Sequence, residues 1–155
     1  MAWYEFNGVR LSHPEGWEIT REETGAGVTV TVSPGGASFW AVTKLPFGVR
    51  ADEAVETVTE AYREEYDDLD VRDAEPTADA AHAEELLEAV TAARPGPGVD
   101  LEWSVHDLPV AGRVRTVEIA DVTLLVTCQA DAIDWDDLVA DFEMLTGSLR
   151  AAEDD

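Results

Sequence analysis

A strong excess of acidic side chains distinguishes this chain, which has 155 residues, 34 aspartates and glutamates, and ten basic residues. Nucleic acids and anionic membrane surfaces bind clustered lysine and arginine, so the formal net charge of −24 argues against both as partners. Lys44 is the only lysine. Carboxylates with almost no lysine suit a cytoplasm at molar salt, where the Debye length falls to about 3 Å. We therefore expect a halophilic, cytoplasmic protein.

The rest of the composition predicts one folded domain. A hydrophobic content of 45% and five tryptophans exclude disorder. The lone cysteine, Cys128, excludes an internal disulfide and a zinc site built on several thiolates. No apolar run approaches the roughly 20 residues of a membrane span, and the first residues show no signal-peptide pattern. We expect a domain over residues 1–150 and a frayed acidic tail over residues 151–155.

Short strands dominate the first third of the expected structure. Asn7-Gly8 favours a tight hairpin turn between two strands, Trp3–Phe6 and Val9–Ser12. Val28–Val32 alternates valine with threonine, so one side of this strand should contact solvent. Ser38–Leu45 is apolar on both sides and therefore belongs near the middle of a covered sheet. A further strand is expected over Trp17–Arg21.

Helical periodicity follows in three segments. Apolar residues from Val55 to Leu69 recur every three or four positions, which predicts a helix that Asp52 caps and that ends near Asp68. Residues 79–93 are expected to form a second helix, and Asp134 is expected to cap a last one with an apolar stripe up to Leu149. Between the last two helices, strands are expected over Val99–His106, Arg113–Ile119 and Val122–Gln129.

The order of these elements predicts the fold class. Strands and helices come in runs and do not alternate strictly, which favours an α+β domain with a mainly antiparallel sheet. Because the strand Ser38–Leu45 is apolar on both sides, helices are expected on both faces of the sheet. We find no internal repeat in the sequence.

Three segments of the sequence resemble a known superfamily. The segment Leu11–Trp17, with its Pro-Glu-Gly-Trp turn, resembles the opening of PsbP/Mog-like proteins, and Ser33–Trp40 resembles the second hairpin of their small prokaryotic members. Ala51–Leu69 resembles the acidic helix that follows. The resemblance implies an α-β-α sandwich that acts without catalysis. Members of the superfamily include a photosystem subunit, a regulator that binds a small GTPase, and chaperones of secreted effectors. The matched segments are turns and a helix of the structural framework, so no functional residue is carried over from them.

Tryptophans are the candidate binding residues. Four indoles around one sheet are normally core, but any that stays exposed would form an apolar recognition patch. We expect such a patch near Trp17, Trp40 and Trp103, with Trp3 as a further candidate. The partner would be a protein, with a homodimer as one form of this contact.

Catalytic and metal-binding patterns are weak. His106 and Asp107 are the only neighbouring histidine and carboxylate that suit acid-base chemistry, and we expect His106 on a solvated face. Cys128 follows apolar residues on one strand face and is expected to be a small buried side chain. The aspartates between Asp131 and Asp137 lack the glycine and glutamate of a calcium loop, so helix capping explains them better.

The sequence therefore favours a non-enzymatic accessory or chaperone-like domain that binds protein, with no catalytic residue, metal or cofactor. The alternative is a small ligand-binding protein or enzyme with a pocket between sheet and helix, in which His106 and Asp107 would do the chemistry. An exposed apolar patch would support the first hypothesis. A deep cavity with convergent polar groups would support the second.

Overall fold

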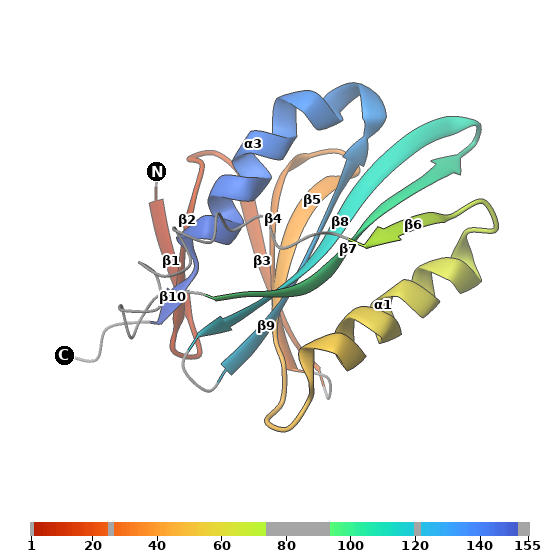
Figure 1. Ribbon diagram of the computed structural model, residues 1–155. Coiled ribbons are helices and arrows are strands. Elements are labelled where there is room, and N and C mark those ends of the chain that lie inside the picture. Colours follow the sequence, from red (N-terminus) through yellow and green to blue (C-terminus); the bar gives the residue numbers. More distant parts are fainter. Residues whose placement is uncertain (1, 25–26, 74–93, 120–121, 152–155) are drawn as a thin grey trace, which may run out of the picture.

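The computed structural model describes residues 2–24, 27–73, 94–119 and 122–151 (Figure 1). The expected helix over residues 79–93 and residues 152–155 of the expected tail lie outside this range. The described elements, in chain order, are β1 (Ala2–Phe6), β2 (Val9–His13), β3 (Glu18–Thr24), β4 (Gly27–Gly35), β5 (Ser38–Lys44), α1 (Ala51–Glu65), β6 (Asp70–Asp73), β7 (Arg94–Val105), β8 (Leu108–Ile119), β9 (Val122–Asp131), α3 (Ala132–Ser148) and β10 (Arg150–Ala151).

The described strands form two antiparallel sheets. The larger has seven strands in the order β3-β4-β5-β9-β8-β7-β6, and the smaller has three in the order β1-β2-β10. This arrangement confirms the α+β class with a mainly antiparallel sheet. As expected, β5 lies inside the large sheet, where Trp40, Ala41 and Val42 are all buried. In β4 the valines Val30 and Val32 are buried, which confirms the alternation seen in the sequence.

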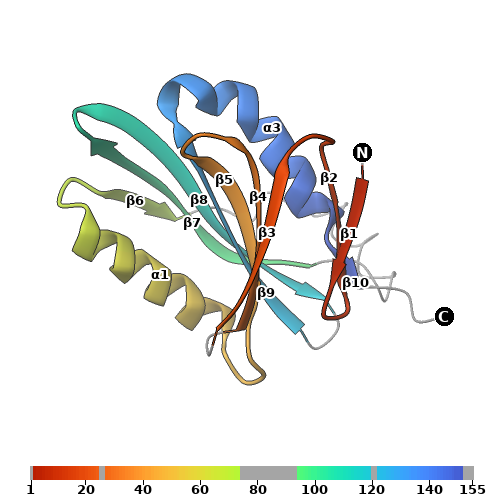
Figure 2. The same ribbon diagram turned by 180° about the vertical axis from the view of Figure 1, so that it is seen from behind.

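Two separate apolar cores hold the helices. The first core joins α3 to β2, β4, β5 and β9, and the second joins α1 to β7 and β8. Leu124 belongs to the first core and its neighbour Leu125 to the second. Figures 1 and 2 show α1 and α3 apart from each other, with strands of the large sheet between them.

Two tight hairpins shape the strands. Asn7 and Gly8 form the turn between β1 and β2 with positive φ angles of 43° and 83°, which confirms the expected hairpin. His106 and Asp107 form a second turn of this kind, with φ of 52° and 65°, between the 12-residue strands β7 and β8. The expected strand end at His106 is one residue from the observed end of β7, but the next strand begins at Leu108 and not at Arg113. The sequence did not reveal the turn because neither of its residues is glycine, although Asp107 tolerates the left-handed conformation.

The ends of the helices differ from the expectation. Arg50 and Asp131 occupy the N-cap positions of α1 and α3, and neither side chain makes a capping hydrogen bond. Asp52 and Asp134 instead lie in the first turns, where a carboxylate still favours the positive end of the helix dipole. Ala151, which the sequence placed in the frayed tail, pairs with Val9 because Arg150 and Ala151 extend the small sheet.

Candidate functional site

Trp40 and Trp17 lie against α3. Trp40 is fully buried, and its indole Nε1 donates a hydrogen bond to Thr146 Oγ1 at 3.0 Å. Trp17 is half-buried and meets Phe142 edge to face, with 6.2 Å between the ring centroids. Because α3 covers both indoles, Trp40 cannot reach a partner and Trp17 offers only part of its ring. The expected exposure of Trp40 was therefore wrong.

Trp103 is buried under α1. Tyr62 and Tyr66 both lie with ring centroids 5.1 Å from its indole, and only 3% of Trp103 is exposed. Gly112 on β8 leaves room for the ring, since a Cβ there would come within 3.1 Å of it. The indole completes the second core. The expected phase of this strand, with Trp103 inward, is confirmed, and its expected role as an exposed anchor was wrong.

Among these four candidate tryptophans, Trp3 is the most exposed, at 51%. It lies on β1, with the guanidinium carbon of Arg10 4.2 Å from the ring centroid. Arg10 thus covers one face of the indole, and stacking of this kind is worth about 0.5–1 kcal/mol at an exposed site. Trp3 lies in the small sheet, away from Trp103 in the second core, so the tryptophans do not form one surface.

The titratable candidates do not form a catalytic site in the described residues. His106 and Asp107 are exposed at the β7–β8 turn, which confirms the solvated position of His106. Cys128 is buried as expected, and burial raises the pKa of its thiol to about 12, although Arg113 and Arg115 oppose this shift. A thiol with this pKa is protonated at neutral pH and is a poor nucleophile. No group of three or more histidine, cysteine or acidic side chains in the described ranges could hold a metal ion.

A groove crosses β6, β7 and β8 on the side of the sheet that faces α3, and we call it the β7 groove. It consists of two hollows that share Asp70, Glu102 and Ala111. The smaller, of about 140 Å³, reaches Arg72, Arg113 and Trp135, and the larger, of about 340 Å³, reaches Ser104, Pro109 and Ala132. Asp100, Glu102 and Ser104 follow one another along the same face of β7, so the groove runs along this strand.

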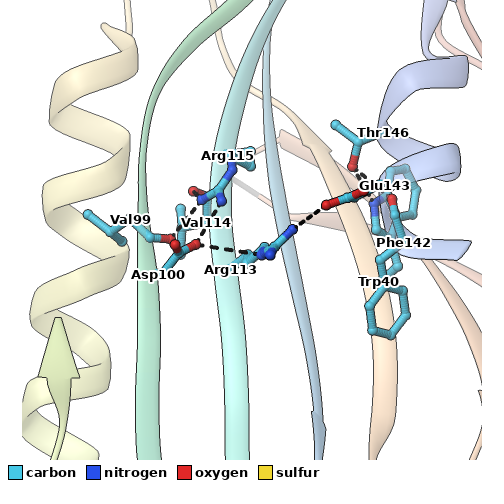
Figure 3. A network of polar contacts seen from close by, with 9 residues as sticks. All are labelled: Trp40, Val99, Asp100, Arg113, Val114, Arg115, Phe142, Glu143 and Thr146. Carbon is cyan, nitrogen blue, oxygen red and sulfur yellow. Dashed lines mark hydrogen bonds and ion pairs between the residues drawn. The ribbon is translucent and has the colours of Figure 1, made fainter. Parts of the chain in front are cut away.

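An ion-pair network joins Asp100 and Arg113, which line the smaller hollow, to Arg115 and Glu143 (Figure 3). Arg113 on β8 reaches Glu143 of α3 at 2.7 Å and Asp100 of β7 at 3.6 Å. Arg115 reaches the same oxygen of Asp100 at 2.7 Å and donates to the carbonyls of Val99 and Val114, each at 3.0 Å. The network therefore fixes α3 to the strands that form the groove.

Trp135 completes the smaller hollow of the β7 groove. It lies in the first half of α3, and its ring centroid is 5.3 Å from the guanidinium carbon of Arg113. Arg113 thus contacts two carboxylates and one aromatic ring, and only 27% of its side chain is exposed. Such a guanidinium has little capacity left for an added anion.

The middle of the β7 groove is acidic. Asp70 of β6 and Glu102 of β7 are cross-strand partners on this face, so two carboxylates lie side by side. The lining contains four carboxylates, Asp68, Asp70, Asp100 and Glu102, against two arginines, Arg72 and Arg113. Both arginines already have carboxylate partners. The arrangement can therefore accept a cation more readily than an anion.

The sequence contained part of the signal for this site. Arg113 and Arg115 are the only arginines in the chain two positions apart, and this spacing places both on one face of a strand. Their partners Asp100 and Glu143 lie 13 and 30 positions from Arg113, so only the strand register and the path of α3 bring them together. The acidic pair Asp70 and Glu102 likewise depends on the pairing of β6 with β7.

Comparison with known proteins shows the fold. No protein-family model and no curated protein matches the chain. A protein of unknown function from Pseudomonas aeruginosa, PA94, described as a putative regulator, is similar over 99% of both chains, with a TM-score of 0.50 and 12% identity. The cyanobacterial PsbP protein CyanoP of Synechocystis sp. PCC 6803 is similar over 97% of this chain and 92% of its own, with a TM-score of 0.54 and 12% identity. The chain therefore has a PsbP-like fold.

None of the described helices combines the length and the apolar character that crossing a bilayer requires.

Proposed function

We propose that this chain is a non-enzymatic accessory or chaperone-like domain of a halophilic prokaryote, which binds a protein partner through the β7 groove. We propose further that it is a small member of the PsbP/Mog-like superfamily and that α1 and α3 cover opposite faces of the large sheet. The alternation of Leu124 and Leu125 between the two cores supports this sandwich, because neighbouring residues of a strand point to opposite faces.

The β7 groove is the observation that carries the proposal. Its two hollows share Asp70, Glu102 and Ala111, and both charged and apolar residues line them. An extended groove with both charged and apolar lining residues suits a segment of another protein better than a compact ligand.

A pocket for a small ligand between sheet and helix is the second candidate. The hollow between Arg113 and Trp135 supports it, because that hollow lies between β8 and α3. Its volume of about 140 Å³ is smaller than the roughly 300 Å³ at which typical ligand pockets begin. His106 and Asp107 do not line either hollow, so an enzyme would lack the acid-base pair expected from the sequence.

Site-specific photo-crosslinking tests the proposal. A photoreactive phenylalanine derivative in place of Ser104 lies in the β7 groove, and the same derivative in place of Thr20, exposed on β3, is the control. We expect an adduct of defined mass at Ser104 in cells and none at Thr20. Equal labelling at both positions, or an adduct at Thr20 alone, would contradict a partner in the groove.

Salt dependence tests the halophilic part of the proposal. Repulsion among the charges of a chain with net charge −24 extends over about 30 Å at 0.01 M salt and over about 3 Å at 1 M. We expect a higher melting temperature in about 2 M KCl than in about 0.1 M KCl. A melting temperature that stays flat or falls across this range is the result that would refute adaptation to molar salt.

A further inference from the structure

We propose that the occupant of the β7 groove is an extended peptide segment of a partner protein, with a lysine or arginine next to apolar side chains. This inference rests on the proposed protein-binding function and names the chemistry of the partner. The basic side chain lies against Asp70 and Glu102, and an apolar side chain lies in the wider hollow beside Pro109 and Ala132.

The length of the groove indicates an extended segment. Asp100, Glu102 and Ser104 line it in succession, and four residues of strand span about 13 Å at roughly 3.3 Å per residue. An extended peptide has the same rise, so four or five of its residues match this length. A helix rises only about 1.5 Å per residue, so it would place about nine residues along the same length.

The charge of the groove indicates a basic residue. The guanidinium of Arg113 is already held by Asp100, Glu143 and the ring of Trp135. Arg72 pairs with Asp70 at 3.2 Å, but both side chains are more than half exposed, so this pair contributes little. Glu102 lies beside Asp70 as a second carboxylate in the same cross-strand pair. An ammonium or guanidinium between these two carboxylates removes their repulsion, and an added carboxylate increases it.

The wider end of the groove indicates an apolar neighbour. Pro109, Ala111 and Ala132 contribute apolar groups to its lining. The polar groups at this end are the carboxylates on one margin and Ser104. A second copy of this chain fits this site poorly, because its net charge of −24 would place more carboxylates against Asp68, Asp70 and Glu102.

A selection from random peptides tests the inference. A library of random peptides, about twelve residues long, is selected on the wild-type protein in about 0.15 M KCl, where the Debye length is about 8 Å and charge pairs in the groove still contribute. Counter-selection uses Ala111→Phe, which fills the part shared by both hollows. Ser104→Tyr replaces it if the first variant melts well below the wild type.

The expected result is enrichment of peptides with a lysine or arginine beside apolar residues, which the filled variant does not bind. The affinity of an enriched peptide should fall about tenfold for Asp70→Asn with Glu102→Gln, which corresponds to about 1.4 kcal/mol. The control, Glu22→Gln with Glu56→Gln, removes the same charge from exposed positions on β3 and α1 and should leave the affinity within about twofold.

Four results would overturn the inference. Groove-dependent peptides without a basic residue would contradict the charge argument but keep the proposed function. If no peptide depends on the groove but photo-crosslinking at Ser104 persists, the peptide inference is wrong and the proposed function is kept. If neither groove-dependent peptides nor crosslinking at Ser104 is found, the proposed function is refuted as well. Sedimentation that shows a dimer, abolished by Ala111→Phe, would identify a second copy as the occupant.

Discussion

The two faces of β7 and β8 differ in the side chains that they carry. On the face toward α1, Leu101 and Trp103 of β7 and Val114 of β8 are buried in the second core. On the opposite face, Asp100 and Glu102 line the β7 groove beside charged residues of β6 and β8. The face toward α1 buries apolar side chains and so fixes the strands. The opposite face carries charged side chains on these fixed strands.

Under the proposed function, this difference separates stability from recognition along a single strand. Apolar burial contributes about 25 cal/mol per Å² and is concentrated on the α1 face, so substitutions there should unfold the protein. Exposed ion pairs contribute only about 0–1 kcal/mol each, so the groove face can change its charges at little cost. The predictions that follow test whether the two faces are as different as their side chains indicate, from the largest expected effect to the smallest.

Removal of the central aromatic ring should have the largest effect. Trp103→Ala deletes an indole that is 97% buried between Tyr62, Tyr66 and the sheet, and we expect a loss of about 3–5 kcal/mol in the free energy of unfolding. The neighbouring substitution Ser104→Ala, on the groove face, should stay within about 0.5 kcal/mol. Denaturant unfolding of both variants measures this. If the two costs are reversed, β7 is shifted by one residue.

Added volume on the α1 face should have the next largest effect. A Cβ at Gly112 would lie 3.1 Å from two atoms of the Trp103 ring and 3.1 Å from the carbonyl oxygen of Cys128. Gly112→Val should therefore cost about 1–3 kcal/mol through overpacking. Gly147→Ala is the control, because no atom lies within 4 Å of its added Cβ in α3, and it should stabilise by about 0.5–1 kcal/mol. A neutral Gly112→Val would show that the Trp103 ring moves freely.

High pH should weaken the α1 face through Tyr62. The pKa of this phenol is raised from 10.0 to about 12. Burial is the largest cause, and the charges of Tyr66, Cys128 and Glu65 raise the pKa further. The unfolded chain therefore loses the phenol proton first, and the stability present below pH 10 is lost as the pH rises toward 12. The melting temperature should fall between pH 9 and pH 12. It should fall less in Tyr62→Phe.

Cys128 requires a control in this experiment. Burial also raises the pKa of its thiol, from 9.0 to about 12, so its contribution to stability is lost over a window that begins near pH 9. Chains with Tyr62 and with Tyr62→Phe are therefore compared in a Cys128→Ala background. An equal slope with and without Tyr62 would mean that its hydroxyl, which donates to Gln129 Oε1 at 3.3 Å, is more solvated than its position indicates.

The sequence predicted the apolar face better than the charged one. Period-two alternation placed Trp103 inward, and three-to-four-residue spacing placed Val55 and Tyr62 toward the sheet, because burial patterns repeat locally. The groove depends on distant pairings. Glu102 meets Asp70 only through the register of β6 with β7, and no local pattern encodes that register. The segment that covers Trp40 was not predicted for the same reason, since Thr146, which accepts the hydrogen bond of the indole, lies 106 residues away.

Removal of one carboxylate from the groove should have the smallest effect, and its sign is informative. Like charges directly opposite each other on a sheet are destabilising, and opposite-charge pairs contribute about 0.2–1 kcal/mol, so relief of the repulsion between Asp70 and Glu102 should be of similar size. Glu102→Gln should therefore raise the free energy of unfolding by about 0.2–1 kcal/mol at low salt. The gain should vanish near 1 M KCl, where the Debye length is about 3 Å.

The control for this last substitution is Glu22→Gln on β3, whose cross-strand partner is Thr29 and which should be neutral. A residue kept for binding is expected to cost stability, because selection for function maintains an unfavourable arrangement in the free protein. If Glu102→Gln is instead destabilising, the carboxylate has a structural partner. The acidic middle of the groove would then belong to the scaffold, and the case for a basic ligand would rest on the peptide selection alone.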